Sequence, residues 1–206
     1  ESITWRLEGP FDSSYSLALV NRETARALAA FGHEVVLHST EGPGDFPANK
    51  RFLDENPDLA KMNQRAPAVT QAESDVTSRN LYPPRVADMN SRLNLLHGYA
   101  WEESGFPSKW VDSFNHVLRG VLVTSKHVKK VLIDNGVTVP IAICENGVDH
   151  WDRILPDTSA KIQARTFRFL HVSSCFPRKG ADVMLEAYGR SFSQHDDWMY
   201  LNCESQ

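Results

Sequence analysis

The sequence has little cysteine, no long apolar run and no stretch dominated by positive charge. The three cysteines, Cys144, Cys175 and Cys203, are too widely spaced for a disulfide framework or a Cys-x-x-Cys metal site, so we expect reduced core residues. No apolar run approaches the roughly 18 residues of a membrane span, and the first residues lack the regions of a signal peptide. We therefore predict a cytoplasmic protein, with peripheral contact at the inner face of a membrane left open.

The charge balance argues against nucleic acid as a partner. The 22 Lys+Arg residues are outnumbered by 26 Asp+Glu residues, which gives a net charge of -4. Binding to a phosphate backbone needs cations gathered in a stripe, whereas these are scattered along the chain. Hydrophobic residues make up 41% of the chain, which is enough for a globular protein to bury a core.

Two common nucleotide-binding signatures are also missing. The dinucleotide fingerprint GxGxxG is absent, because the loop after the first predicted strand contains a single glycine, Gly9. The phosphate-binding loop GxxxxGK[ST] occurs nowhere in the chain. These absences disfavour an NAD enzyme and a P-loop nucleotide hydrolase.

The sequence does contain short apolar segments that alternate with segments of helical spacing. Gly32 and Gly136 stand where helices stop, and Ser125 stands where a helix N-cap belongs. Strands are predicted at 3–7, 34–38, 93–97, 120–124 and 141–144, and helices at 17–31, 107–117 and 126–135. This alternation predicts an α/β fold, a Rossmann-like parallel sheet with helices on both faces.

Two parts of the chain depart from this alternation. The segment 41–80 is broken by prolines, so we expect loops, short helical pieces within 49–62 and a weak strand near Ala68 or Val76. The polar segment after Asn146 reads as a connector. We therefore predict one domain at 1–150, a connector at 151–165 and part of a second Rossmann-like domain at 166–206.

The second predicted domain holds only a βαβ unit. Its elements are a strand at 168–172, a loop at 173–179, a helix at 181–192 and a strand at 198–202. Three elements cannot bury both faces of a sheet. We therefore expect the chain to be a fragment of a longer protein.

Candidate site residues follow the predicted strands, because ligands of parallel sheets bind at the carboxyl ends. The loop 8–16, with Gly9, Ser13 and Ser14, leads into a helix N-terminus that favours an anion or a hydroxyl-rich ligand, unless it only links strand to helix. His97 ends a strand and is followed by Gly98, which permits close approach of a substrate. An imidazole there could donate a hydrogen bond to a sugar hydroxyl or a carbonyl.

Three further positions complete the candidate set. Glu102, with its neighbour Glu103, follows His97 in a loop and could offer a carboxylate to the same cavity, or form a solvated turn. Asn146-Gly147 follows a strand at the domain boundary and is typical of a tight turn with positive φ. Arg178-Lys179 precede a helix, where two cations could stabilise a diphosphate or form a solvated patch.

Together these pieces resemble glycosyltransferase family 4, whose members fold as two facing Rossmann-like domains of the GT-B type. The specific parts are Asn146-Gly147-Val148-Asp149 and, further along, Arg178-Lys179-Gly180 followed by a helix. The strand ending in His97-Gly98 supports them. The resemblance spans most of the chain and is weakest from 41 to 89.

The resemblance implies transfer of a sugar, with retention of configuration, from a nucleotide-sugar donor to a glycan or lipid-linked acceptor. Family members generally need no bound metal or other cofactor, and the Asp-x-Asp metal motif of GT-A transferases is absent here. By this resemblance His97 would face the donor sugar, the loop 8–16 would lie near the diphosphate and acceptor, and Lys179 would hold the diphosphate. With half of the donor pocket absent, the fragment alone is expected to be inactive.

Two departures from the family pattern limit the resemblance. Ser173-Ser174 stands where the family often has Gly-Arg, so Arg178 is the candidate replacement for a missing cation. The chain also stops before the Glu-x7-Glu segment that contacts the donor. Two alternatives stay open: a non-catalytic carbohydrate-binding or scaffold module with the same half-fold, and a GT-B-like sugar-nucleotide epimerase.

Overall fold

The structure, a computed structural model, describes residues 2–148, 152, 154–159, 167–173, 176–193 and 198–203. The chain divides into two compact units, which we call unit 1 (Glu1–Gly147) and unit 2 (Val148–Gln206).

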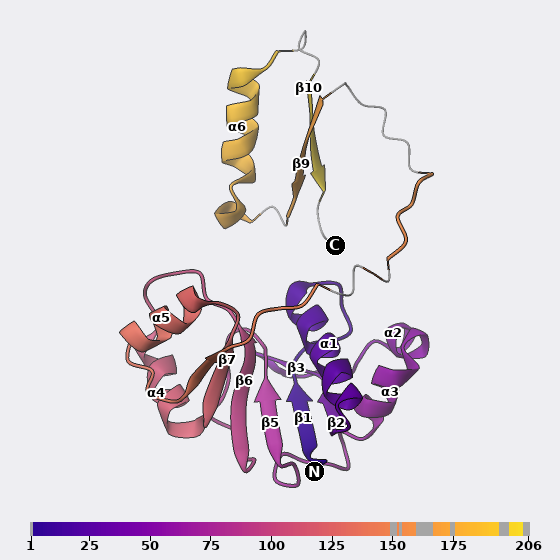
Figure 1. Cartoon of the computed structure of the whole chain (residues 1–206), viewed down its shortest axis with the longest axis vertical. Helices are drawn as coiled ribbons and strands as arrows, with labels where there is room; N and C mark the ends of the chain where they lie inside the picture. Colours follow the sequence, from indigo (N-terminus) through magenta and orange to yellow (C-terminus); the bar gives the residue numbers. More distant parts are fainter. Residues whose placement is uncertain are drawn as a thin grey trace. The chain divides into compact units, whose positions relative to one another are not determined.

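Unit 1 is built on a six-stranded sheet in which every neighbouring pair of strands is parallel (Figure 1). The strands lie in the order β2-β1-β5-β6-β7-β8. Their bounds are β1 Thr4–Glu8, β2 Glu34–His38, β5 Val76–Arg79, β6 Leu93–Tyr99, β7 Gly120–Val123 and β8 Ile141–Ile143. This all-parallel sheet with its helices confirms the predicted Rossmann-like α/β fold.

Helices form most of the connections between these strands. They are α1 Ser16–Ala30, α2 Lys50–Glu55, α3 Pro57–Gln64, α4 Ser108–Val117 and α5 Lys126–Asp134. A small antiparallel hairpin, β3 (Thr40–Glu41) and β4 (Gly44–Asp45), follows β2. The connection from β5 to β6 contains no helix, so loops take the place that a helix would occupy.

The helix α1 covers one face of the sheet, and α4 and α5 cover the other. Alternate residues of a strand point to opposite faces, so the strand residues in each apolar cluster identify the face. Leu7 of β1 packs with Ala25 of α1 in one apolar cluster. Leu96 of β6 is in register with Arg79, which is in register with Glu8, so these three side chains share the other face. There Leu96 packs in a second cluster with residues of α4 and α5.

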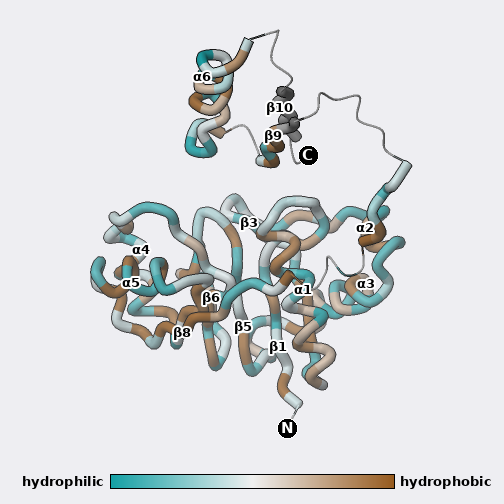
Figure 2. Tube along the Cα trace, turned by 45° about the horizontal axis from the view of Figure 1, so that its top comes forward, coloured by the Kyte–Doolittle hydropathy of each residue, from teal (hydrophilic) through white to brown (hydrophobic). Residues whose placement is uncertain are grey.

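The larger apolar cluster lies where α4 and α5 cover β6 and β7. Its aromatic side chains meet edge to face: the ring centroids of Tyr99 and Phe114 lie 5.6 Å apart, and those of Tyr99 and Phe106 lie 6.3 Å apart. Such geometry is favourable beyond the area that the rings bury. In Figure 2 the brown, apolar segments run through the strands around β6 and β8.

Most predicted elements are confirmed with small shifts at their ends. Ser125 Oγ accepts a hydrogen bond from the Val128 amide at 3.2 Å and caps α5, as predicted. Gly136 follows α5 with a φ of 97°, in the left-handed region that favours glycine. The strand predicted near Ala68 or Val76 is confirmed at Val76 as β5, which lies inside the sheet and is buried along its length, whereas Ala68 lies in a turn.

Unit 2 contains two parallel strands, β9 (Phe167–Val172) and β10 (Trp198–Cys203), paired along their length. The 3-10 helix η2 (Pro177–Lys179) and the helix α6 (Ala181–Ser191) lie between them in the sequence. Leu170 and Val172 are 67% and 64% exposed, because one helix cannot cover both faces of two strands. The predicted connector at 151–165 lies largely outside the described residues, and 154–157 are irregular.

The predicted burial of the cysteines is wrong for Cys144, which is exposed. It follows β8 directly, at the point where the chain leaves the sheet and its core. Cys175 lies outside the described residues, as does the side chain of Cys203.

Candidate functional site

The carboxyl ends of β1 and β5 define the candidate site. From β1 the chain passes to β2 on one side, whereas β5 to β8 continue on the other side. Loops that leave adjacent parallel strands in opposite directions leave room for a ligand between them. Glu8 is the last residue of β1 and Arg79 is the last residue of β5, so both side chains lie at this edge.

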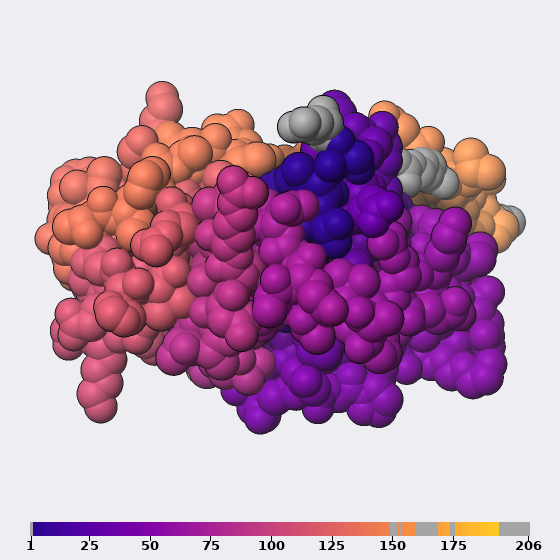
Figure 3. Space-filling model, turned by 90° about the horizontal axis from the view of Figure 1, so that it is seen from below, coloured from indigo at the N-terminus to yellow at the C-terminus, as the bar shows by residue number. Residues whose placement is uncertain are grey.

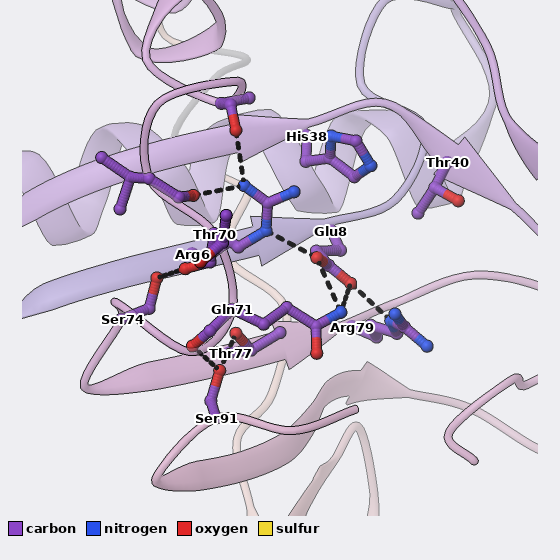
Figure 4. Close-up of polar contacts among 12 residues, drawn as sticks. Arg6, Glu8, His38, Thr40, Thr70, Gln71, Ser74, Thr77, Arg79 and Ser91 are labelled. Carbon is purple, nitrogen blue, oxygen red and sulfur yellow. Dashed lines mark hydrogen bonds and ion pairs between the residues drawn. The ribbon is translucent and has the colours of Figure 1, made fainter. Parts of the chain in front are cut away.

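Glu8 is the centre of a buried polar network (Figure 4). Arg6 Nε donates to Glu8 Oε1 at 2.6 Å, and Arg79 Nε donates to Glu8 Oε2 at 2.6 Å. Gln71 Nε2 donates to the same two oxygens at 3.1 and 3.2 Å. Both carboxylate oxygens of Glu8 therefore have two partners, which offsets the cost of burying this charge.

The two guanidinium groups extend the network to the loops that cover this face. Arg6 Nη1 donates to the carbonyl oxygens of Ala66 at 3.1 Å and Val69 at 2.7 Å. Arg79 binds both oxygens of Asp88, at 2.6 and 3.0 Å. Figure 3 views the opposite side, at the amino ends of the strands, where purple and magenta residues lie beside the indigo N-terminal residues.

Electrostatics keep the network ionised. Burial raises the pKa of Glu8, but Arg79 and then Arg6 lower it by more, so the pKa lies below its ordinary value. Burial lowers the pKa of Arg79, and the hydrogen bond to Asp88 and the charge of Glu8 outweigh this effect. The hydrogen bonds from Arg79 lower the pKa of Asp88. All three groups are therefore charged at neutral pH.

A cavity of about 350 Å³ opens beside this network; we call it the network cavity. Its lining includes Arg6, Glu8, Gln71, Arg79, Arg85 and Asp88, from β1, β5 and the loops before and after β5. A neighbouring hollow, also of about 350 Å³, shares His38, Asp45 and Ala66 with it. The sheet face that carries Glu8 and Arg79 is covered here by loops and not by a helix, and it is therefore polar and partly open to solvent.

The loop after β1 lies at the carboxyl end of the strand, as predicted. A Cβ atom at Gly9 would lie 2.4 Å from both Asn21 Nδ2 and the Asn80 carbonyl oxygen, so only glycine fits there. Ser13 and Ser14 are exposed, and the Ser13 carbonyl accepts a hydrogen bond from Arg22 at 2.6 Å. The loop is therefore fixed at its start and open to solvent at its two serines.

His97 is enclosed rather than open to a ligand, since it is only 3% exposed. Asn21 Nδ2 donates to the carbonyl oxygens of Pro10 and Asn80, which fixes its amide so that Oδ1 accepts from His97 Nε2 at 2.9 Å. The proton of the neutral ring is thus on Nε2, and Nδ1, buried without a partner among the described residues, is an acceptor. In this structure the N–H of His97 donates to Asn21 and is not free for a substrate, which corrects the prediction from the sequence.

The sequence predicts that this strand ends at His97, but β6 continues to Tyr99. Its register with β7 shifts between Leu96 and Tyr99, which inserts one extra residue as a bulge. Gly98 lies in this bulge with a φ of 57°, and a Cβ atom there would lie 2.8 Å from Val20 Cγ1. Glu102 lies in the exposed loop that follows and does not line the network cavity.

The remaining predicted residues lie at the boundary of the units and in unit 2. Asn146 and Gly147 are exposed in irregular backbone, so the predicted tight turn is not formed. Arg178 and Lys179 belong to η2, and Gly180 follows with a φ of 66° before α6 begins. The two cations therefore precede the helix α6, as predicted.

Sequence reasoning missed Arg6 and Arg79 as site residues. A signal was present, because Arg6 and Glu8 alternate with Trp5 and Leu7 in a strand expected to be buried. Charges at alternate positions of a buried strand indicate a polar interior, since buried charges are found paired.

Within the described part of the chain, no group of three or more His, Cys, Asp or Glu side chains could hold a metal ion. None of the described helices is both long enough and apolar enough to cross a membrane. No protein-family model matches this chain, and no curated protein matches it.

Proposed function

We propose that the chain is part of a GT-B type sugar transferase, a retaining enzyme that moves a sugar from a nucleotide-sugar donor to a glycan or lipid-linked acceptor. The observation that carries the proposal is the succession of a six-stranded parallel sheet and a second parallel βαβ unit along one chain. Each parallel sheet offers loops at its carboxyl edge, which suits a reaction with two substrates. A nucleotide-sugar donor agrees with the predicted cytoplasmic location, at the inner membrane face for a lipid-linked acceptor.

The cations of unit 2 are suited to the leaving group of this reaction. A nucleoside diphosphate gains negative charge as the sugar departs, and fixed cations or helix N-terminal N–H groups stabilise that charge. Arg178 and Lys179 precede the helix α6, so both kinds of donor occur together in the sequence. No metal is needed for this step in the proposal.

Unit 1 supplies the acceptor side in this proposal. The loop with Gly9, Ser13 and Ser14 is open to solvent at the carboxyl end of β1, next to a helix N-terminus. His97 would take part as a neutral acceptor through Nδ1, after the side chains that enclose it move.

A non-catalytic carbohydrate-binding module is the second candidate, and the enclosure of His97 favours it. An imidazole that no substrate reaches cannot contribute to transfer. The module predicts saturable binding of a glycan with no turnover of any donor, whereas an epimerase predicts conversion of the donor without an acceptor.

Isothermal titration of the intact protein with a panel of nucleotide sugars tests the proposal. We expect one donor to bind and Lys179→Ala to weaken it about tenfold or more, because a charged hydrogen bond to the diphosphate is lost. Lys126→Ala is the matched control, since Lys126 is also exposed at a helix start and should leave binding unchanged. Absence of binding by every nucleotide sugar would end the proposal.

A further inference from the structure

We propose that the network cavity binds a carboxylate or phosphate group of a ligand. Calling this ligand the acceptor rests on the proposed sugar transfer, whereas the oxyanion site itself rests on the geometry of unit 1. The hydrogen-bond acceptors of the cavity walls are in use, two donors have no partner among the described residues, and the buried charges leave a positive excess.

The carboxylates that line the cavity already have partners. Glu8 accepts from Arg6, Arg79 and Gln71. Both oxygens of Asp88 accept from Arg79, and Asp45 Oδ1 lies 3.1 Å from His38 Nε2. An incoming hydroxyl or ammonium group would have to compete with these charged donors.

Two donor nitrogens of the residues that line the cavity, in contrast, have no partner among the described residues. Arg85 Nη2 donates to Thr40 Oγ1 at 2.8 Å and its Nη1 lies 3.3 Å from Asp88, but its buried Nε has no partner among the described residues. The second η nitrogen of Arg6 also has no hydrogen-bond partner in the described part of the chain, and Figure 4 draws no dashed line to it, but this atom is open to water and not buried. A buried donor without a partner is costly, so a group that accepts hydrogen bonds is the complementary ligand.

The buried charges also favour an anion. Arg6, Arg79 and Glu8 are 6%, 1% and 2% exposed, so two positive charges and one negative charge lie at the base of the cavity. The side chains of Asp88 and Asp45 are 47% and 65% exposed, and water screens them more strongly. An oxyanion at the base therefore meets a net positive charge and the Arg6 Nη2 group, which has no partner among the described residues.

The neighbouring hollow supplies space for the rest of the ligand. Ser39 is 4% exposed and lines this hollow, and its Oγ has no hydrogen-bond partner among the described residues. The lining is otherwise largely apolar, with Phe46, Pro47 and Ala48. A sugar ring has both hydroxyl groups and apolar C–H faces, so a sugar bearing a carboxylate or phosphate suits the two hollows together.

The test is an NMR titration of the full chain that follows the arginine side-chain Nε–H signals. The probes are inorganic phosphate, D-glucuronate and D-glucose, and glucose is the neutral counterpart of glucuronate. We expect saturable shifts of the Arg85 and Arg6 signals with phosphate, glucuronate or both, and the stronger binder identifies the oxyanion. Equal binding of glucose and glucuronate, or no shift with phosphate and glucuronate, would overturn the proposal.

Two variants test the role of Arg85. Arg85→Met should weaken binding of the shifting probe about tenfold or more, whereas Arg65→Met should not. Arg65 is the matched control because its side chain is 37% exposed, against 34% for Arg85, and it forms an ion pair away from the cavity. If Arg85→Met remains folded by circular dichroism and binds as well as the parent chain, the assignment fails. These experiments use no nucleotide sugar, so they test the oxyanion site separately from the proposed sugar transfer. If the cavity binds an oxyanion but the protein transfers no sugar, the site stands and only its identification as the acceptor site fails.

Discussion

At the scale of single residues, His97 links burial to acid sensitivity. Burial lowers its pKa from 6.5 to about 3. Between these values the unfolded chain binds a proton that the folded chain does not bind, so the stability contributed by neutral His97 is complete above pH 6.5 and is lost as the pH falls towards 3. The slope is about 1.4 kcal/mol per pH unit for one proton.

Replacement of His97 by glutamine should remove this acid sensitivity. Glutamine can still donate to Asn21 but does not titrate, so the free energy of unfolding of His97→Gln should fall less steeply than that of the parent between pH 6 and pH 4. Urea unfolding at a series of pH values measures the difference. His116→Gln is the control, because His116 is exposed on α4 and should leave the slope unchanged. Parallel slopes for His97→Gln and the parent would contradict the assignment.

The carboxylates of the network act in the same direction at lower pH. The folded-state pKa values of Glu8 and Asp88 lie below their ordinary values, so the stability they contribute is present above those ordinary values and is lost as the pH falls through the folded values. Comparison of His97→Gln with the parent isolates the histidine, because both chains retain these carboxylates.

At the scale of the elements, the bulge in β6 depends on one glycine. Gly98→Ala would put a Cβ atom 2.8 Å from Val20 Cγ1 in a left-handed conformation, so we expect a loss of about 1–3 kcal/mol in the free energy of unfolding. Urea unfolding measures the loss. Gly105→Ala is the control, because nothing lies within 4 Å of a Cβ atom there, and a change within about 0.5 kcal/mol is expected. An equal effect of the two substitutions would show that the bulge tolerates a side chain.

The elements also show how far sequence reasoning reaches. Strands with continuous apolar residues, such as β2 and β7, and helices with a cap such as Ser125 were predictable because burial and capping leave local patterns. The central position of β5 was not, because three of its four residues, Thr77, Ser78 and Arg79, are polar. Their partners lie far away in sequence: Ser78 Oγ accepts from Trp5, and Arg79 binds Glu8.

The candidate site was less predictable than the fold for the same reason. The loop after β1 and the cations before α6 follow strand ends that the sequence marks, so their places were confirmed. The hydrogen bond of His97 depends on Asn21, whose orientation is set by two backbone carbonyls that no sequence pattern reveals. The network cavity likewise arises from a loop between α3 and β5 that folds over a charged sheet face.

At the scale of the whole molecule, unit 1 contains both of its apolar clusters within its own bounds. A chain that ends at Gly147 should therefore fold by itself and unfold in one cooperative step. Urea unfolding and an amide NMR spectrum measure this, and the signals of β1 to β7 should match those of the longer chain. A fragment without dispersed signals would show that unit 1 depends on residues beyond its bounds.

The hold of Arg6 on the carbonyl oxygens of Ala66 and Val69 has a consequence for protein engineering. Because every amino acid has a carbonyl oxygen, these two hydrogen bonds depend on the path of the main chain and not on the identity of the side chains. Val69, which is only partly buried, can therefore be varied in a library while Arg6 is kept, and the path of the loop over the sheet should be retained.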